Sequence, residues 1–131
     1  MRWITMPDSP RWKHFFKFWM PVYIYAAFIF YQSSLSSLPF GASCFLDFFC
    51  ADKLIHLAEY AILSCLIARA VKNSARKDLK RHFRIWAVTA ALFYGITDEW
   101  HQHFISGRHV EFFDVVADGI GAYLGQFFIT H

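Results

Sequence analysis

The sequence predicts an all-α protein, built as a four-helix transmembrane bundle with a polar cluster near the outer membrane face. The composition is the first reason: 56% of the 131 residues are hydrophobic and 21% are aromatic, which is more apolar than soluble chains of this size usually are. The second reason is the length of the uncharged stretches. No residue from Phe18 to Leu46 carries a charge, and a spanning helix needs about 20 mostly apolar residues. The alternative is a soluble, phenylalanine-rich helical bundle.

Four apolar windows predict helices that cross the membrane, and none shows the alternation of a barrel strand. Pro21 lies early in the first window and Pro39 lies after it, which favours a helix that stops before the serine-rich segment 33–37. An aromatic turn at the membrane interface is expected at 45–49. We expect residues 1–15 to be a cytoplasmic segment and residues 16–131 to form the membrane domain. The four windows are approximately 16–34, 54–71, 85–104 and 112–130.

The basic residues predict the orientation of the bundle. Four of the 13 Lys and Arg residues precede the uncharged stretch that begins at Phe18 and seven lie at 69–84, so that eleven fall on one side. Cytoplasmic loops and ends are enriched in Lys and Arg. Both termini and the loop between the second and third windows are therefore expected in the cytoplasm, with the protein in a bacterial inner (cytoplasmic) membrane. The basic loop indicates contact with membrane lipids and not with nucleic acid.

Most of the remaining polar side chains fall on the outer side of this predicted topology. A charged side chain at the centre of a bilayer costs about 2.5 kcal/mol or more, so such groups usually face a polar cavity or one another. The cluster is therefore the first candidate for a functional site. The residues expected to bind a ligand there are Lys53, His56, Tyr60, Asp98, Glu99, Gln102, Arg108, Asp114 and Asp118.

Spacing along the predicted helices indicates which of these side chains share a helix face. Residues three or four apart lie on one face, which pairs His56 with Tyr60 and Asp98 with Gln102. On the last helix the residues Asp114, Asp118, Gly121 and Gly125 form one stripe. Its G-x-x-x-G half predicts close helix packing, either within the chain or in a homodimer.

Three polar residues have more specific expected roles. Arg108 follows Ser106 and Gly107, and its guanidinium suits bidentate binding of a carboxylate or a phosphate. We expect it to pair with Glu99 or Asp114 or to bind an anionic head group. His56 is expected either to bridge to a carboxylate on the third helix or to act in function. Asp52 is expected to cap the start of the second helix.

The sequence does not predict a metal or a cofactor. It lacks an H-E-x-x-H motif and a C-x-x-C pair. A metal-assisted site would use His56, Glu99 and His103. Cys65 is expected to pack in an apolar helix, and the spacing of Cys44 and Cys50 leaves a disulfide between them open.

The order of these motifs resembles the VanZ-like family of small integral membrane proteins, named after a protein associated with resistance to the glycopeptide teicoplanin. The resemblance runs from about Ser33 to Gly125. It implies a membrane fold, a place in the cell envelope and a link to antibiotic resistance, more than it implies a reaction. The matching pieces are Ser33-Ser34 with Pro39, Asp52-Lys53-x-x-His56-x-x-x-Tyr60, Asp98-Glu99-x-x-Gln102, Arg108 and Asp114-x-x-x-Asp118-x-x-Gly121-x-x-x-Gly125.

Three functions fit the predicted cluster. In the favoured one, an outward-facing pocket binds a polar or anionic envelope molecule, such as a lipid-linked envelope intermediate or a glycopeptide. In the second, the protein is a membrane-embedded enzyme in which Glu99 or Asp98 acts as general base and His56 as its partner. In the third, it is a structural or assembly subunit whose buried acids hold the helices together, or a small ion-coupled carrier whose buried acids relay protons.

Overall fold

The computed structural model describes residues 10–35 and 45–129, with the side chains of 45–50 left out. The question of a disulfide between Cys44 and Cys50 therefore lies outside the described residues. Within them every regular element is helical, which confirms the all-α prediction. The elements are α1 (Arg11–His14), a π-helical turn (Phe15–Trp19), α2 (Met20–Ser33), α3 (Phe45–Lys72), α4 (Lys77–Arg81), α5 (Phe83–Gln102), α6 (Phe112–Gly125) and a 3-10 turn (Gln126–Phe128).

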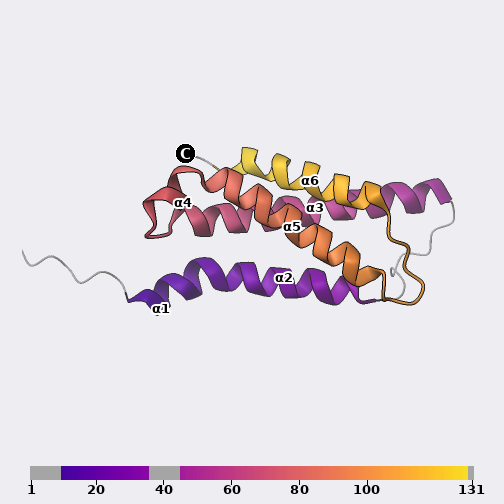
Figure 1. Cartoon of the computed structure of the whole chain (residues 1–131), viewed down its shortest axis with the longest axis horizontal. Helices are drawn as coiled ribbons and strands as arrows, with labels where there is room; N and C mark the ends of the chain where they lie inside the picture. The colour runs from indigo at the N-terminus through magenta and orange to yellow at the C-terminus, as the bar shows by residue number, and fades with distance from the viewer. Residues whose placement is uncertain (1–9, 36–44, 130–131) are drawn as a thin grey trace, which may run out of the picture.

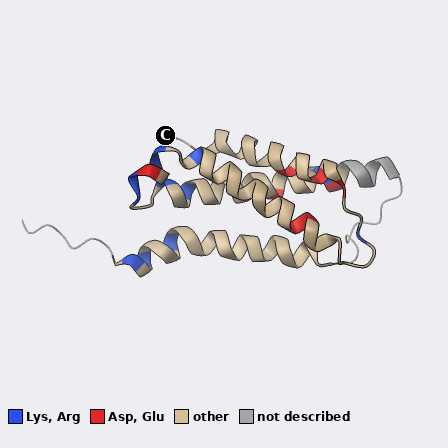
Figure 2. Ribbon diagram, in the orientation of Figure 1, with Lys and Arg blue, Asp and Glu red and all other residues tan. Residues whose placement is uncertain are grey.

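Four long helices run lengthwise beside one another (Figure 1). α3 contacts α2, α5 and α6, and α5 contacts both α2 and α6. α1, α4 and the C-terminal end of α6 lie at one end of the molecule, and the connection between α5 and α6 lies at the other. Lys and Arg gather mainly at the first end, while most Asp and Glu lie towards the second (Figure 2).

The second helix starts earlier than the sequence predicts. α3 already begins at Phe45, so the aromatic turn predicted at 45–49 is wrong. Asp52 lies inside α3 and does not cap it. The physical reason is that no glycine or proline separates Phe45 from Leu54, and only such residues strongly oppose continuation of a helix.

One described helix is long and apolar enough to cross a membrane by length and composition. This is the Ala51–Lys72 part of α3, with 22 residues and a mean hydropathy of 1.6. α2 and α6 have 14 residues each, fewer than the roughly 20 that a span needs. α5 has 20 residues but includes Arg84, Asp98 and Glu99.

Pro21 shapes the junction between α1 and α2. Proline has no backbone N–H, so the carbonyl of Lys17, four residues earlier, loses its usual helical donor. A π-helical turn covers Phe15–Trp19, as is common where the regular hydrogen-bond ladder is interrupted. Arg69 of α3 supplies a donor instead, with its Nη2 2.8 Å from the Lys17 oxygen. This bond joins the first helix to α3.

Replacing Arg69 with methionine should lower the free energy of unfolding by about 1 kcal/mol, because the Lys17 carbonyl then loses its donor. Thermal unfolding of the detergent-solubilised protein, followed by circular dichroism, measures the change. Arg76→Met is the control, since Arg76 is also exposed and lies in the same basic region. Equal unfolding temperatures for the two variants would contradict this role of Arg69.

The buried faces of α5 and α6 change character along their length. On α5, Ala87, Ala91 and Gly95 are followed by the buried polar residues Asp98, Glu99 and Gln102. On α6, the buried Asp114 and Asp118 precede Gly121, Ala122 and Gly125. Small residues allow helices to approach closely. The carboxylates of both helices consequently lie at the same end of this tightly packed interface.

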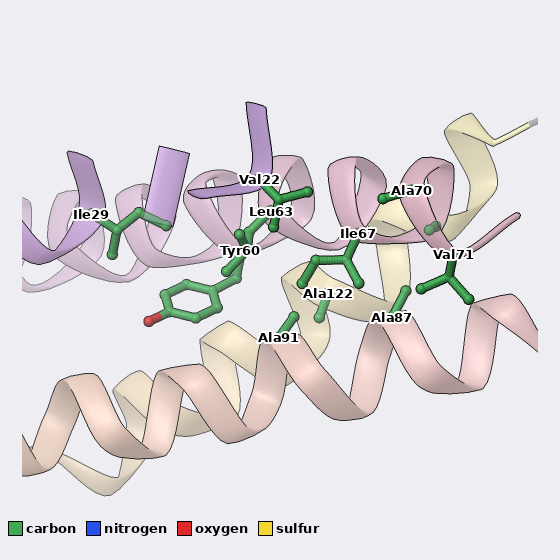
Figure 3. Close-up of a cluster of buried hydrophobic side chains, with 11 residues drawn as sticks. Val22, Ile29, Tyr60, Leu63, Ile67, Ala70, Val71, Ala87, Ala91 and Ala122 are labelled. Carbon is green, nitrogen blue, oxygen red and sulfur yellow. The ribbon is translucent and has the colours of Figure 1, made fainter. Parts of the chain in front are cut away.

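The apolar core borders the carboxylates and extends from them towards the other end. Its side chains come from all four long helices, including Ile29, Leu63, Ile67, Ala91 and Ala122 (Figure 3). Several core positions on α5 and α6 are alanine, so much of the larger apolar surface faces outward. The exposed residues include Phe28 and Tyr31 on α2, Phe93 and Trp100 on α5, and Phe112, Tyr123 and Phe127 on or next to α6.

Candidate functional site

Two glycines bring α6 against α3. A Cβ atom on Gly121 would collide with the carbonyl oxygen of Leu57, and one on Gly125 would collide with that of Ala61. Leu57 and Ala61 lie one turn apart on α3, so the two backbones meet over that turn. The sequence predicts that this face of α6 packs closely, either within the chain or in a homodimer. In the structure, α3 of the same chain occupies it.

The close approach places His56 of α3 beside Asp118 of α6. His56 Nδ1 lies 2.9 Å from Asp118 Oδ1, and the two residues are 5% and 0% exposed. The expectation that His56 bridges to a carboxylate on the third helix is wrong. The partner lies on α6 because the glycines make α6 the closer neighbour of α3 at this level.

Gly95 of α5 completes the surroundings of Asp118. A Cβ atom at Gly95 would lie 2.6 Å from Asp118 Oδ2, closer than real Cβ contacts come, so only glycine leaves room for the carboxylate. Sequence reasoning missed Gly95. Its signal is a glycine inside an apolar helical pattern, where glycine costs about 1 kcal/mol relative to alanine and usually has a packing reason.

Lys53 joins α3 to the start of α6. Its Nζ lies 2.7 Å from Glu111 Oε2 and also contacts Asp114 Oδ1. Asp52 is next to it in sequence, with Oδ2 3.8 Å from the ammonium. The sequence predicts Lys53 and Asp114, but not Asp52 and Glu111, as ligand-binding residues. Asp52 lies next to Lys53 within a helix because α3 begins before it.

α5 adds three buried polar residues to the cluster. Gln102 Nε2 donates to Asp98 Oδ2 at 3.4 Å. The two residues are four apart, so they lie on one face of α5, as the sequence predicts. Neither carboxylate oxygen of Glu99 has a hydrogen-bond partner among the described residues, and the same holds for the Tyr60 hydroxyl. The strongest electrostatic interactions of Glu99 with other side chains involve Asp114 and His56.

Arg108 binds the end of α2 and not a carboxylate. Its Nε donates to the Leu35 oxygen at 3.0 Å and its Nη2 to the Gln32 oxygen at 3.3 Å. The predicted internal pairing with Glu99 or Asp114 is therefore wrong. The last carbonyl groups of a helix lack intrahelical donors, and Arg108 provides donors at the end of α2. Gly107, just before Arg108, has a φ of 84°, a backbone conformation that favours glycine.

The space inside the cluster is small. A cavity of about 10 Å³ lies between α2, α3 and α5, enough for roughly one water molecule. Its lining residues are Ile29, Gln32, Ser33, Asp52, Ile55, His56, Glu59, Asp98, Gln102 and Arg108. The outward-facing pocket that the sequence predicts is thus, in this structure, too narrow for a lipid head group or a glycopeptide.

A larger groove opens on the outer side of α3 and α6. It has a volume of about 380 Å³ and is almost entirely apolar except at Lys53. The remaining lining residues are Leu54, Leu57, Phe113, Val116, Ala117 and Ile120. Spacing along the chain does not predict this groove, because its two walls come from helices about 60 residues apart in the chain.

The model of the VanZ/LLP1 family matches residues 4–130, nearly the whole chain. The chain belongs to the VanZ/LLP1 family. No curated protein and no solved structure matches it significantly. Proteins of the VanZ family are generally membrane-associated, in keeping with the apolar α3. The VanZ-like resemblance of the polar motifs is thereby confirmed.

Proposed function

We propose that this VanZ/LLP1 protein is a multi-pass protein of the bacterial cytoplasmic membrane that binds a phosphate-bearing envelope lipid. The head group lies at Lys53, and the lipid chain lies in the groove between α3 and α6. The observation that carries this proposal is the groove itself, which is apolar along its length and ends at a lysine.

The distribution of polarity supports a four-helix transmembrane bundle. Asp98, Glu99, Asp114 and Asp118 are buried, while large apolar side chains cover much of the outside. In soluble proteins Asp and Glu are rarely fully buried without a partner, as Glu99 is among the described residues, and large contiguous apolar patches are rarely exposed. In a bilayer the same arrangement is favourable, because lipid covers the apolar side chains and the carboxylates face the bundle interior. Short helices such as α6 are accommodated by local thinning of the bilayer or by flanking polar residues.

The arrangement of the helices supports the predicted orientation. The basic end of the molecule carries α1, α4 and the C-terminal end of α6 (Figure 2). Cytoplasmic regions are enriched in Lys and Arg, so we assign this end to the cytoplasm. The carboxylate cluster and Lys53 then lie towards the outer leaflet, where envelope intermediates are found after they cross the membrane.

A lipid is favoured over a water-soluble ligand because the groove opens on the apolar surface and the polar cavity holds only about one water. An acyl or polyprenyl chain buries apolar surface in the groove at about 0.8 kcal/mol for each CH₂ group. The Lys53 ammonium, which also contacts Glu111 and Asp114, provides a charge-assisted donor to a phosphate oxygen. If the lipid carries a cell-wall precursor, its binding also connects the protein to glycopeptide resistance.

An acid-base enzyme is less well supported. That mechanism needs His56 within hydrogen-bond reach of Glu99 or Asp98. Among the described residues His56 bonds to Asp118, and Asp98 bonds to Gln102.

Lipid binding is tested by filling the groove. Ile120→Trp should weaken binding of a fluorescent polyprenyl phosphate to the protein in phosphatidylcholine nanodiscs by about tenfold or more, equivalent to about 1.4 kcal/mol. Ile96→Trp is the matched control, because Ile96 is 49% exposed on α5 and Ile120 is 48% exposed on α6. Lys53→Gln should weaken phosphate binding similarly, whereas Lys77→Gln, at the basic end, should not. Binding that Ile120→Trp leaves unchanged would overturn the proposal.

A further inference from the structure

We infer that Asp52, His56 and Asp114 form a binding site for a divalent metal cation. One potential ligand atom from each residue lies within 4.8 Å of the other two. His56 and Asp114 are buried and Asp52 is half-buried. Two of the ligands come from consecutive turns of α3 and the third from the first turn of α6, so the close packing of these helices assembles the site.

The hydrogen bond of His56 prepares its ring for a metal. Nδ1 is bonded to Asp118, which leaves Nε2 as the nitrogen for coordination. Metal-binding histidines almost always donate their other N–H to a carboxylate, a carbonyl or water, which fixes the orientation of the ring and increases its basicity. Asp118 occupies that supporting position here.

Glu99 provides an independent indication of a bound cation. It is 3% exposed, and neither of its carboxylate oxygens has a hydrogen-bond partner among the described residues. Two of the three proposed ligands are close enough to act on it electrostatically: Asp114 repels the Glu99 carboxylate and His56 attracts it. A buried carboxylate without a partner is costly, and a cation next to Asp114 would provide one.

The charges around the site also favour a cation. The buried Asp, Glu and His side chains of the described residues are the four carboxylates Asp98, Glu99, Asp114 and Asp118 together with His56. Lys53, half-buried, contacts Asp114 and lies 3.8 Å from Asp52. Counted as fully ionised, these four carboxylates with Asp52 and Glu111 carry six negative charges, against which Lys53 and a protonated His56 provide two positive charges. A divalent cation would reduce the remaining excess of negative charge.

The set of ligands indicates the class of metal. Carboxylates suit Mg²⁺ and Mn²⁺, whereas an imidazole extends the preference towards first-row transition metals. Mn²⁺ satisfies both and is the probe of choice. The site does not depend on the proposed lipid binding. If both exist, the cation near Lys53 would help the acidic cluster to accept a phosphate.

The test is a titration of the full-length, detergent-purified protein with Mn²⁺ in the absence of added lipid. The loss of the electron paramagnetic resonance signal of free Mn²⁺ reports binding. We expect one saturable site per chain, with an affinity that Asp52→Asn and Asp114→Asn each reduce about tenfold or more. Because no lipid ligand is present, failure of the proposed lipid function would leave this result unchanged.

Asp78→Asn is the control, because Asp78 is an exposed aspartate in α4 at the basic end and its loss should not alter Mn²⁺ affinity. Asp52→Asn is the decisive variant if Asp114→Asn fails to fold, since Asp52 is only half-buried. The inference is overturned if the wild-type protein shows no saturable binding, or if folded Asp52→Asn binds Mn²⁺ as tightly as Asp78→Asn does.

Discussion

Replacing Gly121 with alanine should destabilise the protein by about 3 kcal/mol or more. The new Cβ atom would meet the carbonyl oxygen, carbonyl carbon and Cα of Leu57, all backbone atoms that cannot rotate away. Overpacking of a core typically costs about 1 to 3 kcal/mol and more where the neighbour is rigid. Separation of α6 from α3 would also break the His56–Asp118 and Lys53–Asp114 contacts. Unfolding of the detergent-solubilised protein, followed by circular dichroism, measures the loss.

Gly119 provides a control on the same helix. A Cβ atom there meets only the end of the Leu92 side chain, at 3.4 Å, and alanine is favoured over glycine inside helices by about 1 kcal/mol. Gly119→Ala should therefore leave stability unchanged or raise it slightly. If Gly121→Ala and Gly119→Ala had the same stability, the close contact between α6 and α3 would not exist as described.

Replacing Asp118 with leucine should destabilise the protein by about 3 to 5 kcal/mol, because it leaves His56 buried without its partner. The double variant His56→Leu/Asp118→Leu should recover part of this loss, since a buried ion pair can often be replaced by apolar residues with little cost. Unfolding of the two single variants and the double variant gives the coupling energy between the residues.

The same cycle separates a structural role of the cluster from a functional one. If the double variant is stable but no longer binds Mn²⁺, the pair serves the metal site more than the fold. If the effects of the two substitutions simply add, the two side chains do not interact, and the bond between His56 and Asp118 would be contradicted. Asp78→Leu, at an exposed position, should change stability by only about 0.5 kcal/mol.

Features that depend on spacing along one helix can be predicted from the sequence. The apolar windows predict an all-α chain, and the order of the polar motifs predicts the VanZ family. Spacing of four residues also places Asp98 and Gln102 on one face of α5, where they form a hydrogen bond. These features follow from helix periodicity and composition, which are local properties.

Which helix supplies the partner of each polar residue depends instead on how the helices pack. His56 meets Asp118 because Gly121, Gly125 and Gly95 leave room for α6 beside α3 and α5. Asp52 joins His56 and Asp114 because α3 begins before it. Arg108 reaches the end of α2 instead of a carboxylate. Such contacts depend on the rotation and distance of packed helices, to which every side chain at the interface contributes, and spacing along a single helix does not specify them.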